Sequence, residues 1–302
     1  MTASPESNQA AQPQQFTGRV AVITGASQGL GAAIAHLMAA RGVAGLLLVG
    51  RNTDRGQAVA EALPCPARFV SVDLAADDAA TTVMSAADET YGRVDTLVNA
   101  AALTVRGSVW DTDAELWSNM LNVNTRAPAL LITEAAKIMV REKIEGTMVS
   151  VGSVAASGGQ DFLYPYSASK IALQAITRNA AFSLMRHRIR VNLVQPGWMK
   201  TEGEDVIQRR FHGADDGWLA EAEAAQPFGR LIDPAELART ICFLASDESG
   251  MMTGTTMDYD QSILGAGDVS KPDLQPVWGE RRVVEDDPKR VSPRAKPGNG
   301  KE

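Results

Sequence analysis

The sequence contains little cysteine and histidine, and this limits the chemistry that it can support. There are two cysteines and three histidines in 302 residues. Cys65 and Cys242 fit neither a disulfide framework nor a pair of metal ligands. The three histidines, His36, His187 and His212, are scattered along the chain. We therefore expect no disulfide, no metal site and a reducing, cytoplasmic setting.

Excess positive charge and long apolar runs are also missing. The formal net charge is −7 and the pI is near 5.2, which argues against nucleic acid or an anionic membrane surface as the main partner. No run approaches the roughly 18 consecutive apolar residues of a membrane helix. The first residues lack the basic start and apolar stretch of an export signal. A small-molecule ligand is therefore expected.

Short runs of β-type residues alternate with helix-length segments. The runs cover residues 19–24, 45–50, 68–72, 94–99, 147–151, 189–194 and 254–259. Such runs, separated by helices, are typical of a parallel sheet that is covered on both faces. The right-handed crossover rule then favours a doubly wound arrangement. We predict an α/β fold with a Rossmann-type parallel sheet, formed by a single domain over residues 16–265.

The two ends of the chain differ in composition from this domain. Residues 266–302 are rich in proline and mixed charge and lack apolar periodicity. We predict a disordered segment over residues 1–15 and a disordered or loosely docked tail over residues 266–302. Trp278 and Val283–Val284 are the only hints of a docking point in that tail.

A glycine-rich turn joins the first predicted strand to the first predicted helix. It reads TGASQGLG, from Thr24 to Gly31. Glycines at such a turn let the backbone approach a pyrophosphate, whose charge is stabilised by N–H groups at the helix N-terminus. The alternative is a plain tight turn. The position directly after the strand favours the nucleotide site.

A tyrosine and a lysine stand four residues apart in the segment YPYSASK. Pro165 suits the first turn of a helix, so Tyr166 and Lys170 are expected to share one helix face. A free tyrosine has a pKa of about 10, and a neighbouring ammonium group lowers it. The pair therefore favours an acid/base site, with an ordinary surface pair as the alternative.

Together these motifs resemble the short-chain dehydrogenases/reductases. The resemblance covers about residues 17–262 and rests on TGxxxGxG, VDL, LVNAAA, NVN, VGS, YxxxK and PGWMKT, in the family's order. It implies hydride transfer between NAD(P)(H) and a small carbonyl or alcohol substrate such as a sugar, polyol or ketone. Two segments depart from the family's spelling, since many members read NNAG and DGG where this chain reads NAAA and DQS.

The resemblance implies catalytic roles for four residues. Tyr166 is the expected acid/base group. Lys170 is expected to stabilise its phenolate and to hold the nicotinamide ribose. Ser153 is expected to hydrogen-bond the substrate oxygen. Asn124 is expected to position a water molecule that links Lys170 to a proton relay.

The resemblance also implies a set of cofactor contacts at the glycine turn, the strand ends and the PGWMKT segment. The set is Thr24, Gly25, Ser27, Gln28, Gly29, Leu30, Gly31, Arg51, Asn52, Asp73, Leu74, Asn99, Ala100, Ala101, Tyr166, Lys170, Pro196, Gly197, Met199 and Thr201. Asp73 is expected at the adenine, although it could instead cap the following helix. Thr201 is expected at the nicotinamide carboxamide, although it could be an ordinary turn residue.

The end of the second predicted strand favours NADP(H) over NAD(H). NAD-preferring members commonly carry an acidic residue there, which binds the ribose hydroxyls. Here the strand ends in Gly50, and Arg51 follows with a guanidinium group that can bind a 2′-phosphate. Gln28 stands where many NADP-binding relatives have a second basic residue. Arg55 could compensate, but its direction cannot be read from the sequence.

The segment after Thr201 occupies the family's substrate-lid position. Glu202 and Glu204 could hydrogen-bond a sugar or polyol, and Arg209 and Arg210 could meet an acid, while solvated charges are the plainer alternative.

Two rival functions are a 3-oxoacyl-carrier-protein reductase and a non-catalytic cofactor-binding regulator. The acidic net charge argues against the first, and the complete catalytic set argues against the second. The resemblance further implies a homo-oligomer, either a tetramer or a dimer.

Overall fold

The computed structural model describes residues 14–262, in which seven strands form one parallel sheet. The strands are β1 (Val20–Thr24), β2 (Gly45–Gly50), β3 (Ala67–Ser71), β4 (Thr96–Asn99), β5 (Thr147–Val151), β6 (Arg190–Pro196) and β7 (Thr256–Tyr259). Their order across the sheet is β3-β2-β1-β4-β5-β6-β7, and every neighbouring pair is parallel. The chain therefore reverses its direction of winding between β1 and β4, which is where doubly wound folds bind ligands.

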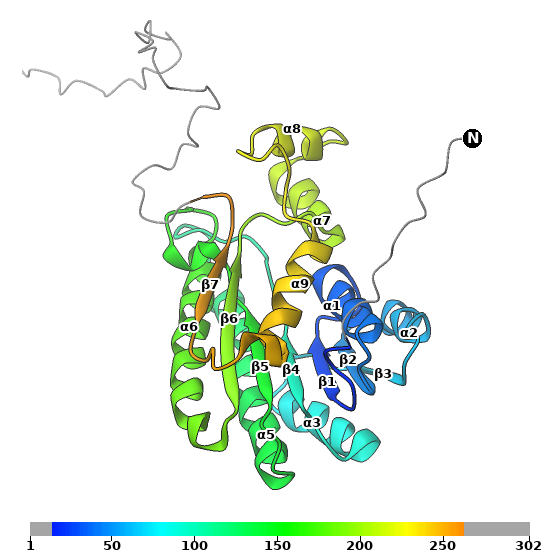
Figure 1. Ribbon diagram of the computed structural model, residues 1–302. Helices are drawn as coiled ribbons and strands as arrows, with labels where there is room; N and C mark the ends of the chain where they lie inside the picture. Colours follow the sequence, from blue (N-terminus) through cyan, green and yellow to red (C-terminus); the bar gives the residue numbers. More distant parts are fainter. Residues whose placement is uncertain (1–13, 263–302) are drawn as a thin grey trace, which may run out of the picture.

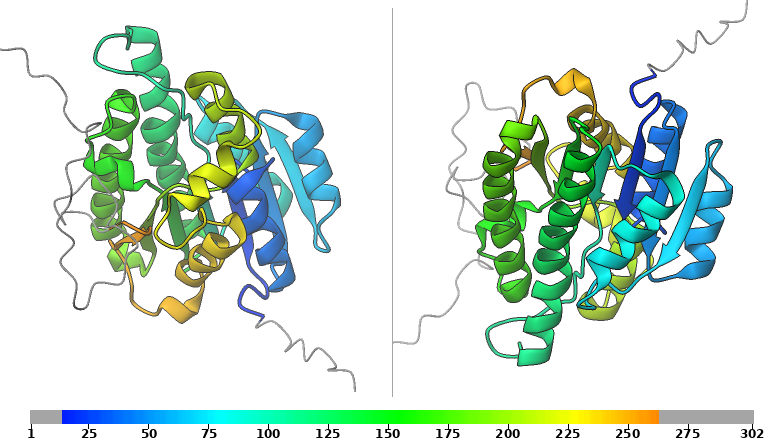
Figure 2. Two further views of the ribbon diagram at one scale, coloured as in Figure 1. Left: turned by 90° about the horizontal axis from the view of Figure 1, so that it is seen from above. Right: turned by 90° about the horizontal axis from the view of Figure 1, so that it is seen from below.

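Helices cover both faces of the sheet, as Figure 2 shows from above and below. One face carries α1 (Gly29–Ala40) and α9 (Pro234–Ala245), which pack against each other, with α2 (Thr53–Glu61) beside β3. The opposite face carries α3 (Ala79–Tyr91), α5 (Ala127–Arg141) and α6 (Tyr164–Leu184). The central strands are buried between these two layers, which explains their continuous apolar runs.

The remaining helices are short and lie near the ends of the strands. They are α4 (Ala114–Leu121), α7 (Glu202–His212) and α8 (Trp218–Ala224). In Figure 1, α7 and α8 lie beyond the carboxyl ends of the strands, above the sheet. A π-helical turn, Asn122–Arg126, joins α4 to α5. Short 3-10 turns are Val154–Ser157, Met185–His187 and Asp247–Ser249.

The α/β prediction is confirmed, and each of the seven predicted runs forms a strand. Two runs match their strands residue for residue, 45–50 and 147–151, and the others differ by one or two residues at their ends. The helix that was expected at Pro165 begins at Tyr164, with the proline in its first turn. The predicted tail of residues 266–302, the docking point at Trp278 and Val283–Val284, and residues 1–13 of the predicted N-terminal segment lie outside the described residues.

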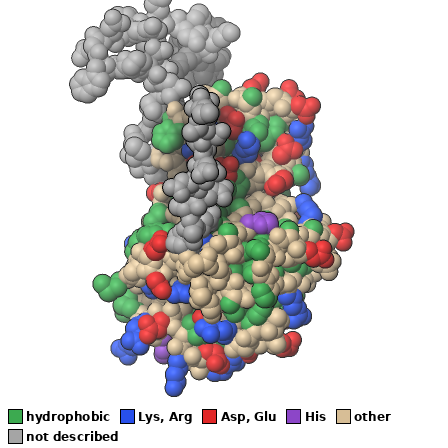
Figure 3. Space-filling model, turned by 45° about the vertical axis from the view of Figure 1, so that its right-hand side comes forward, with side chains coloured by type: hydrophobic (Ala, Val, Ile, Leu, Met, Phe, Trp, Pro, Cys, Tyr) green, Lys and Arg blue, Asp and Glu red, His purple; other side chains and the backbone are tan. Residues whose placement is uncertain are grey.

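The surface of the described part carries charges of both signs. On the part of the face in Figure 3 that is not covered by grey atoms, acidic and basic side chains are interspersed. Within residues 14–262, no helix is long and apolar enough to cross a membrane. The same residues contain no group of three or more histidine, cysteine or acidic side chains that could hold a metal ion.

Candidate active site

The turn between β1 and α1 brings backbone segments unusually close together. A Cβ atom on Gly31 would lie 2.3 Å from the carbonyl oxygen of Gly25, and one on Gly25 would lie 2.8 Å from the backbone of Ala101. Gly25 also has a φ of +70°, which favours glycine. Helix α1 begins after Gln28, whose side chain makes no capping hydrogen bond. Its first N–H groups are therefore available to a phosphate, so the turn fits a dinucleotide.

This turn opens into a cleft of about 1680 Å³ at the carboxyl ends of the strands. Most of the predicted site residues line it: Gly25, Ser27, Gln28, Gly29, Leu30, Gly31, Arg51, Asn52, Asp73, Leu74, Ala100, Ala101, Ser153, Tyr166, Lys170, Pro196, Gly197, Met199 and Thr201. The fold thus brings together residues that are up to 176 positions apart in the chain, from Gly25 to Thr201. Three predicted residues, Thr24, Asn99 and Asn124, lie behind its wall instead.

Thr24 and Asn99 support the cleft from the ends of neighbouring strands. The Thr24 hydroxyl oxygen accepts hydrogen bonds from the backbone N–H groups of Ala100 and Ala101, both at 3.2 Å. These two alanines stand in the segment that departs from the family's usual NNAG, and it is their backbone that the threonine holds. The Asn99 amide donates to the Ser150 hydroxyl at 3.3 Å. Thr24 therefore acts on the cleft through its backbone, whereas Asn99 links the ends of β4 and β5 through their side chains.

Asn124 lies in the π-helical turn and is fully buried. Its amide oxygen accepts from the N–H of Leu103 at 2.7 Å, and its amide nitrogen donates to the carbonyl of Leu103 at 2.9 Å. The nitrogen also lies 3.1 Å from the Ser169 hydroxyl. The side chain therefore clamps the loop after β4 onto α6, and π-helical turns of this kind are frequent at functional sites.

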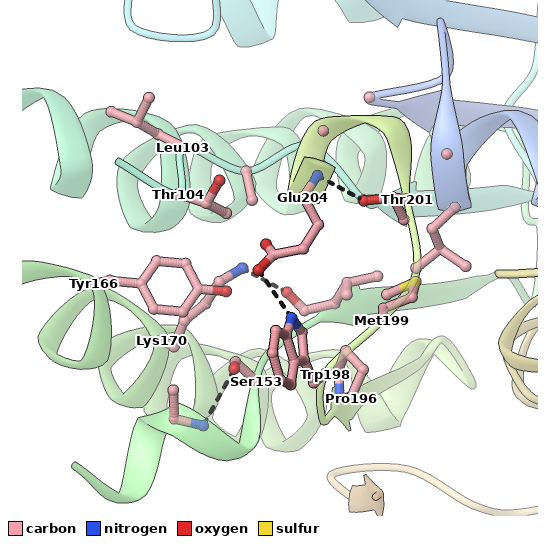
Figure 4. A pocket seen from close by; sticks show the side chains of 18 of the residues that line it. Leu103, Thr104, Ser153, Tyr166, Lys170, Pro196, Trp198, Met199, Thr201 and Glu204 are labelled. Atoms are coloured by element: carbon pink, nitrogen blue, oxygen red, sulfur yellow. Dashed lines mark hydrogen bonds between the residues drawn. The ribbon is translucent and has the colours of Figure 1, made fainter. Parts of the chain in front are cut away.

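Tyr166, Lys170 and Ser153 meet in the cleft, as Figure 4 shows. Tyr166 and Lys170 lie one turn apart on α6, and the Lys170 Nζ is 5.6 Å from the centre of the tyrosine ring. This ammonium group is almost fully buried and donates to the carbonyl of Val151 at 2.8 Å. The Ser153 oxygen accepts from the N–H of Ala155 at 3.1 Å, so its own O–H can donate into the cleft, where it interacts with Tyr166.

The surroundings of these groups alter their protonation. Burial raises the pKa of Tyr166 above 10, and the hydrogen bond with Ser153 and the charge of Arg106 act in the opposite direction. Burial lowers the pKa of Lys170 to about 8. The sequence led us to expect that Lys170 lowers the pKa of Tyr166, whereas here the lowering comes from Ser153 and Arg106 and burial outweighs it. The phenol is therefore protonated near neutral pH, which is the form that can give a proton to a carbonyl oxygen.

Two arginines lie where β2 ends. Arg51 and Arg55 both line the cleft and are exposed. Arg55 donates from its guanidinium group to the side-chain oxygen of Gln28 in the glycine turn. The sequence did not determine where the Arg55 side chain points. In the structure it points toward the cleft. Asn52 caps α2 by accepting from the N–H of Arg55 at 2.9 Å.

Asp73 and Thr201 each had two alternative roles. Asp73 does not cap α3, which starts after Asp78; its carboxylate accepts from the N–H of Ala75 at 3.0 Å within its own turn. Thr201 caps α7, because its hydroxyl oxygen accepts from the N–H of Glu204 at 3.1 Å. Both residues also line the cleft, so these bonds hold the backbone and leave a cofactor contact possible.

A cluster of polar residues from α7 and the loop after β4 forms the other end of the site. Glu204, Gln208 and His212 are spaced four apart on α7, and all three line the cleft. Arg106 faces them from the loop, and Trp198 donates from its indole N–H to Glu204 at 2.9 Å. Figure 4 shows the carboxylate of Glu204 pointing toward the phenol of Tyr166.

The sequence predicted only part of this cluster. Glu202 and Glu204 were both considered as possible substrate contacts. Glu204 lines the cleft, whereas Glu202 does not. Arg209, considered for an acid, pairs instead with Asp205 and Asp216 on the outside of α7. Arg106 was missed, since nothing in its local sequence distinguishes it.

Known proteins resemble this chain over most of its length. A family model described as Enoyl-(Acyl carrier protein) reductase matches residues 25–261. The Short-chain reductase protein NovJ of Streptomyces niveus is 33% identical over 80% of this chain and 92% of its own length. The trans-4-hydroxycyclohexanecarboxylate dehydrogenase of Sinomonas cyclohexanicum is 32% identical over 80% of this chain and 91% of its own length.

Solved structures also resemble this chain over most of its length. One described as a short chain dehydrogenase/reductase family protein superposes with a TM-score of 0.71 at 31% identity, covering 82% of this chain and 97% of its own.

Proposed function

This chain belongs to the short-chain dehydrogenase/reductase family, and we propose that it interconverts a secondary alcohol and a ketone with Tyr166 as the acid/base group. The family assignment makes it an oxidoreductase that acts on alcohol and carbonyl groups with a nicotinamide cofactor. The observation that carries the proposal is the convergence of Tyr166, Ser153 and Lys170 in the cleft that begins at the glycine turn.

A bound nicotinamide would supply the hydride in reduction and accept it in oxidation. In reduction, the Tyr166 hydroxyl gives its proton to the substrate oxygen as the carbonyl carbon is reduced. The O–H of Ser153 donates to the same oxygen and stabilises its developing charge. In oxidation, the phenolate of Tyr166 removes the alcohol proton, and the Ser153 hydroxyl, which lowers the pKa of Tyr166, favours this form.

A substrate panel tests this proposal. Purified protein is mixed with NADPH or NADH and a set of ketones, sugars, steroids and 3-oxo esters, and with the oxidised cofactors and the matching alcohols. We expect a change in nicotinamide absorbance with at least one ketone and its alcohol. Cofactor binding without turnover of any compound would favour the cofactor-binding regulator instead. The name of the relative that acts on a hydroxycyclohexanecarboxylate supports including cyclic secondary alcohols.

We further propose that NADP(H) is preferred over NAD(H). Gly50 carries no carboxylate that would repel a 2′-phosphate, and Arg51 and Arg55 both line this part of the cleft. Gln28, which is not basic itself, orients Arg55 toward the glycine turn. Two guanidinium groups are thus available to one phosphate.

The preference is tested by titrating NADPH and NADH into the wild type and Arg51→Ala. A lost charge-assisted contact costs about 1.5–3 kcal/mol, so NADPH affinity should fall by about 10- to 150-fold while NADH affinity changes little. Arg68→Ala removes an exposed arginine on β3 outside the cleft and serves as the control. Tighter binding of NADH than of NADPH by the wild type would contradict the assignment.

A homo-oligomer is also proposed, and exposed apolar side chains on two adjacent helices support it. Leu130 and Val140 on α5 are 39% and 41% exposed, and Ile171 and Phe182 on α6 are 49% and 79% exposed. Large exposed apolar side chains on adjacent helices are the kind of surface that an interface would cover. A second copy of this chain is the partner that the proposal names.

A cytoplasmic setting is proposed from the cysteines. Cys65 and Cys242 are both free thiols, as expected in a reducing compartment. Burial raises the pKa of Cys242 to about 12, so that this thiol is unreactive.

A further inference from the structure

Arg106 is a charged side chain in the substrate end of the cleft to which the proposed hydride transfer assigns no role. It lies in the loop after β4 and its side chain is only 14% exposed. Its Nε donates to the His212 ring nitrogen at 3.1 Å, and a terminal nitrogen donates to the carbonyl of Thr104 at 3.3 Å. The other terminal nitrogen lies 3.4 Å from the carboxylate of Glu204. The guanidinium group also lies over the ring of Phe162, 5.4 Å from its centre.

None of these contacts is a short ion pair. Other arginines of the chain meet their carboxylates closely, since Arg126 lies 2.6 Å from Asp77 and Arg141 lies 2.6 Å from Asp88. Arg106 is less exposed than either of them. A guanidinium group withdrawn from water needs a close anion to offset the lost hydration. The Arg106 guanidinium therefore has N–H groups beyond those used in these contacts, and its nearest carboxylate, that of Glu204, lies at the long end of hydrogen-bond distance.

Glu204, by contrast, does not depend on Arg106. One of its oxygens accepts from the Trp198 indole at 2.9 Å and from the Gln208 amide at 2.7 Å. These two neutral donors stabilise the carboxylate independently. Arg106 can therefore turn to an incoming anion without leaving Glu204 unpaired.

The position of Arg106 relative to Tyr166 suits an anchor for the substrate. The guanidinium and the phenol line the same cleft, and the two are close enough for the arginine charge to lower the pKa of Tyr166. A substrate whose reacting oxygen lies at Tyr166 and Ser153 could extend toward α7. There Arg106, which contacts α7 from the loop after β4, presents planar, paired donors. A carboxylate matches those donors in shape and charge.

We propose that Arg106 binds a carboxylate of the substrate, so that the substrate is an oxo acid or hydroxy acid. The inference rests on the proposed function, because it assigns the reacting oxygen to Tyr166. Glu204 opposes the ligand's charge at the same place and thereby limits its affinity. Glu204→Gln keeps an oxygen for Trp198 and Gln208 while removing that charge, and it should strengthen binding of the acid.

The test compares acids with their methyl esters. The probes are acetoacetate, levulinate and 4-oxocyclohexanecarboxylate, which place the carboxylate at increasing distances from the carbonyl group, together with the methyl ester of each. Reduction of each compound is measured with saturating NADPH. We expect the acid to exceed its ester in kcat/KM by about 10-fold or more for at least one pair, as a charge-assisted contact predicts. Esters that react as well as the acids throughout the series would overturn the proposal.

Variants of Arg106 separate recognition from a structural role. Arg106→Gln should raise KM for the acid by about 10-fold or more and leave the ester nearly unchanged. Arg106→Lys should recover part of the loss, because it keeps the charge and loses the planar pair of donors. Arg209→Gln removes an arginine from the outer face of α7 and should change neither compound. An equal loss for acid and ester in Arg106→Gln would mean that Arg106 only supports the fold and would refute the proposal.

Direct binding distinguishes this inference from the proposed reaction. Calorimetric titration of the acids into the wild type and Arg106→Gln needs no turnover. If no ketone is reduced but one acid binds the wild type and loses about 10-fold in affinity in the variant, the inference stands and the proposed reaction fails. If ketones are reduced but no acid binds more weakly to the variant, the reaction stands and the inference fails.

Discussion

At the level of single residues, Lys170 has the most unusual electrostatic position in the cleft. Its ammonium group is 1% exposed, and its hydrogen bond within the described chain goes to the neutral carbonyl of Val151. Burial lowers its pKa from 10.5 to about 8. The charged form is therefore less favourable in the folded protein than in the unfolded chain.

This shift predicts how stability depends on pH. Between about pH 8 and 10.5 the unfolded chain holds a proton on Lys170 that the folded protein has released, so folding becomes more favourable as the pH rises through this window. The difference between the pKa of Lys170 in the unfolded chain and in the folded protein corresponds to roughly 3 kcal/mol. The free energy of unfolding of the wild type should therefore rise by up to that amount relative to Lys170→Met.

Chemical unfolding of both proteins at the two ends of the window provides the measurement. Lys137→Met is the control, because that lysine is exposed on α5 and pairs with Glu134. It should show no such change relative to the wild type. A difference between wild type and Lys170→Met that stays constant with pH would contradict the assigned pKa.

The sequence can place residues relative to one another where one motif contains them. Tyr166 and Lys170 could be placed together because four residues make one helical turn. Arg106 and Glu204 are 98 residues apart, and no local spacing relates them. Their meeting depends on how α7 lies over the loop after β4, which only the folded chain determines.

At the level of elements, the turn between β1 and α1 tolerates no side chain at Gly31. An added Cβ would lie 2.3 Å from the Gly25 carbonyl oxygen, and the atoms that it meets, in Gly25 and Ala26, are backbone atoms that cannot shift easily. Gly31→Ala should therefore open the turn, reduce the free energy of unfolding by about 1–3 kcal/mol and weaken NADPH binding by about 10-fold or more.

Urea unfolding and NADPH titration of Gly31→Ala test this expectation. Gly217→Ala is a matched control, since the nearest atom to its added Cβ is a side-chain oxygen at 3.2 Å. It should bind NADPH like the wild type. Unchanged affinity in Gly31→Ala would mean that the glycine turn does not hold the cofactor.

The strands were predictable because their burial on both faces leaves continuous apolar runs. The π-helical turn Asn122–Arg126 was not predicted, although NVN lies within it. Its shape is tied to the hydrogen bonds between Asn124 and Leu103, which lies on a different segment. Local sequence preferences do not contain that information.

At the level of the whole molecule, the outer faces of α5 and α6 predict self-association. Phe182 is 79% exposed near the end of α6, and Met185 beyond it is 51% exposed. If the outer faces of α5 and α6 form an interface, a carboxylate at position 182 would lose its hydration there, and this would make association less favourable. Phe182→Glu should therefore dissociate the oligomer at micromolar concentration.

Light scattering after size-exclusion chromatography measures the molecular mass of both proteins. Met251→Glu is the control, because Met251 is 96% exposed and lies on neither helix. It should keep the wild-type mass. A wild type that is monomeric, or a Phe182→Glu variant of unchanged mass, would contradict this interface.

The fold, the cleft and the cofactor turn all lead to one claim, that the Tyr166 hydroxyl transfers the proton. The most direct measurement is a comparison of Tyr166→Phe with the wild type, in which NADPH affinity and the rate of ketone reduction are determined on the same preparation. Tyr164→Phe, two residues earlier on α6 and 49% exposed, is the control and should behave like the wild type. We predict that Tyr166→Phe binds NADPH normally while kcat falls by about 100-fold or more, as the loss of a general acid requires. Retention of most of the wild-type kcat by Tyr166→Phe would contradict the account.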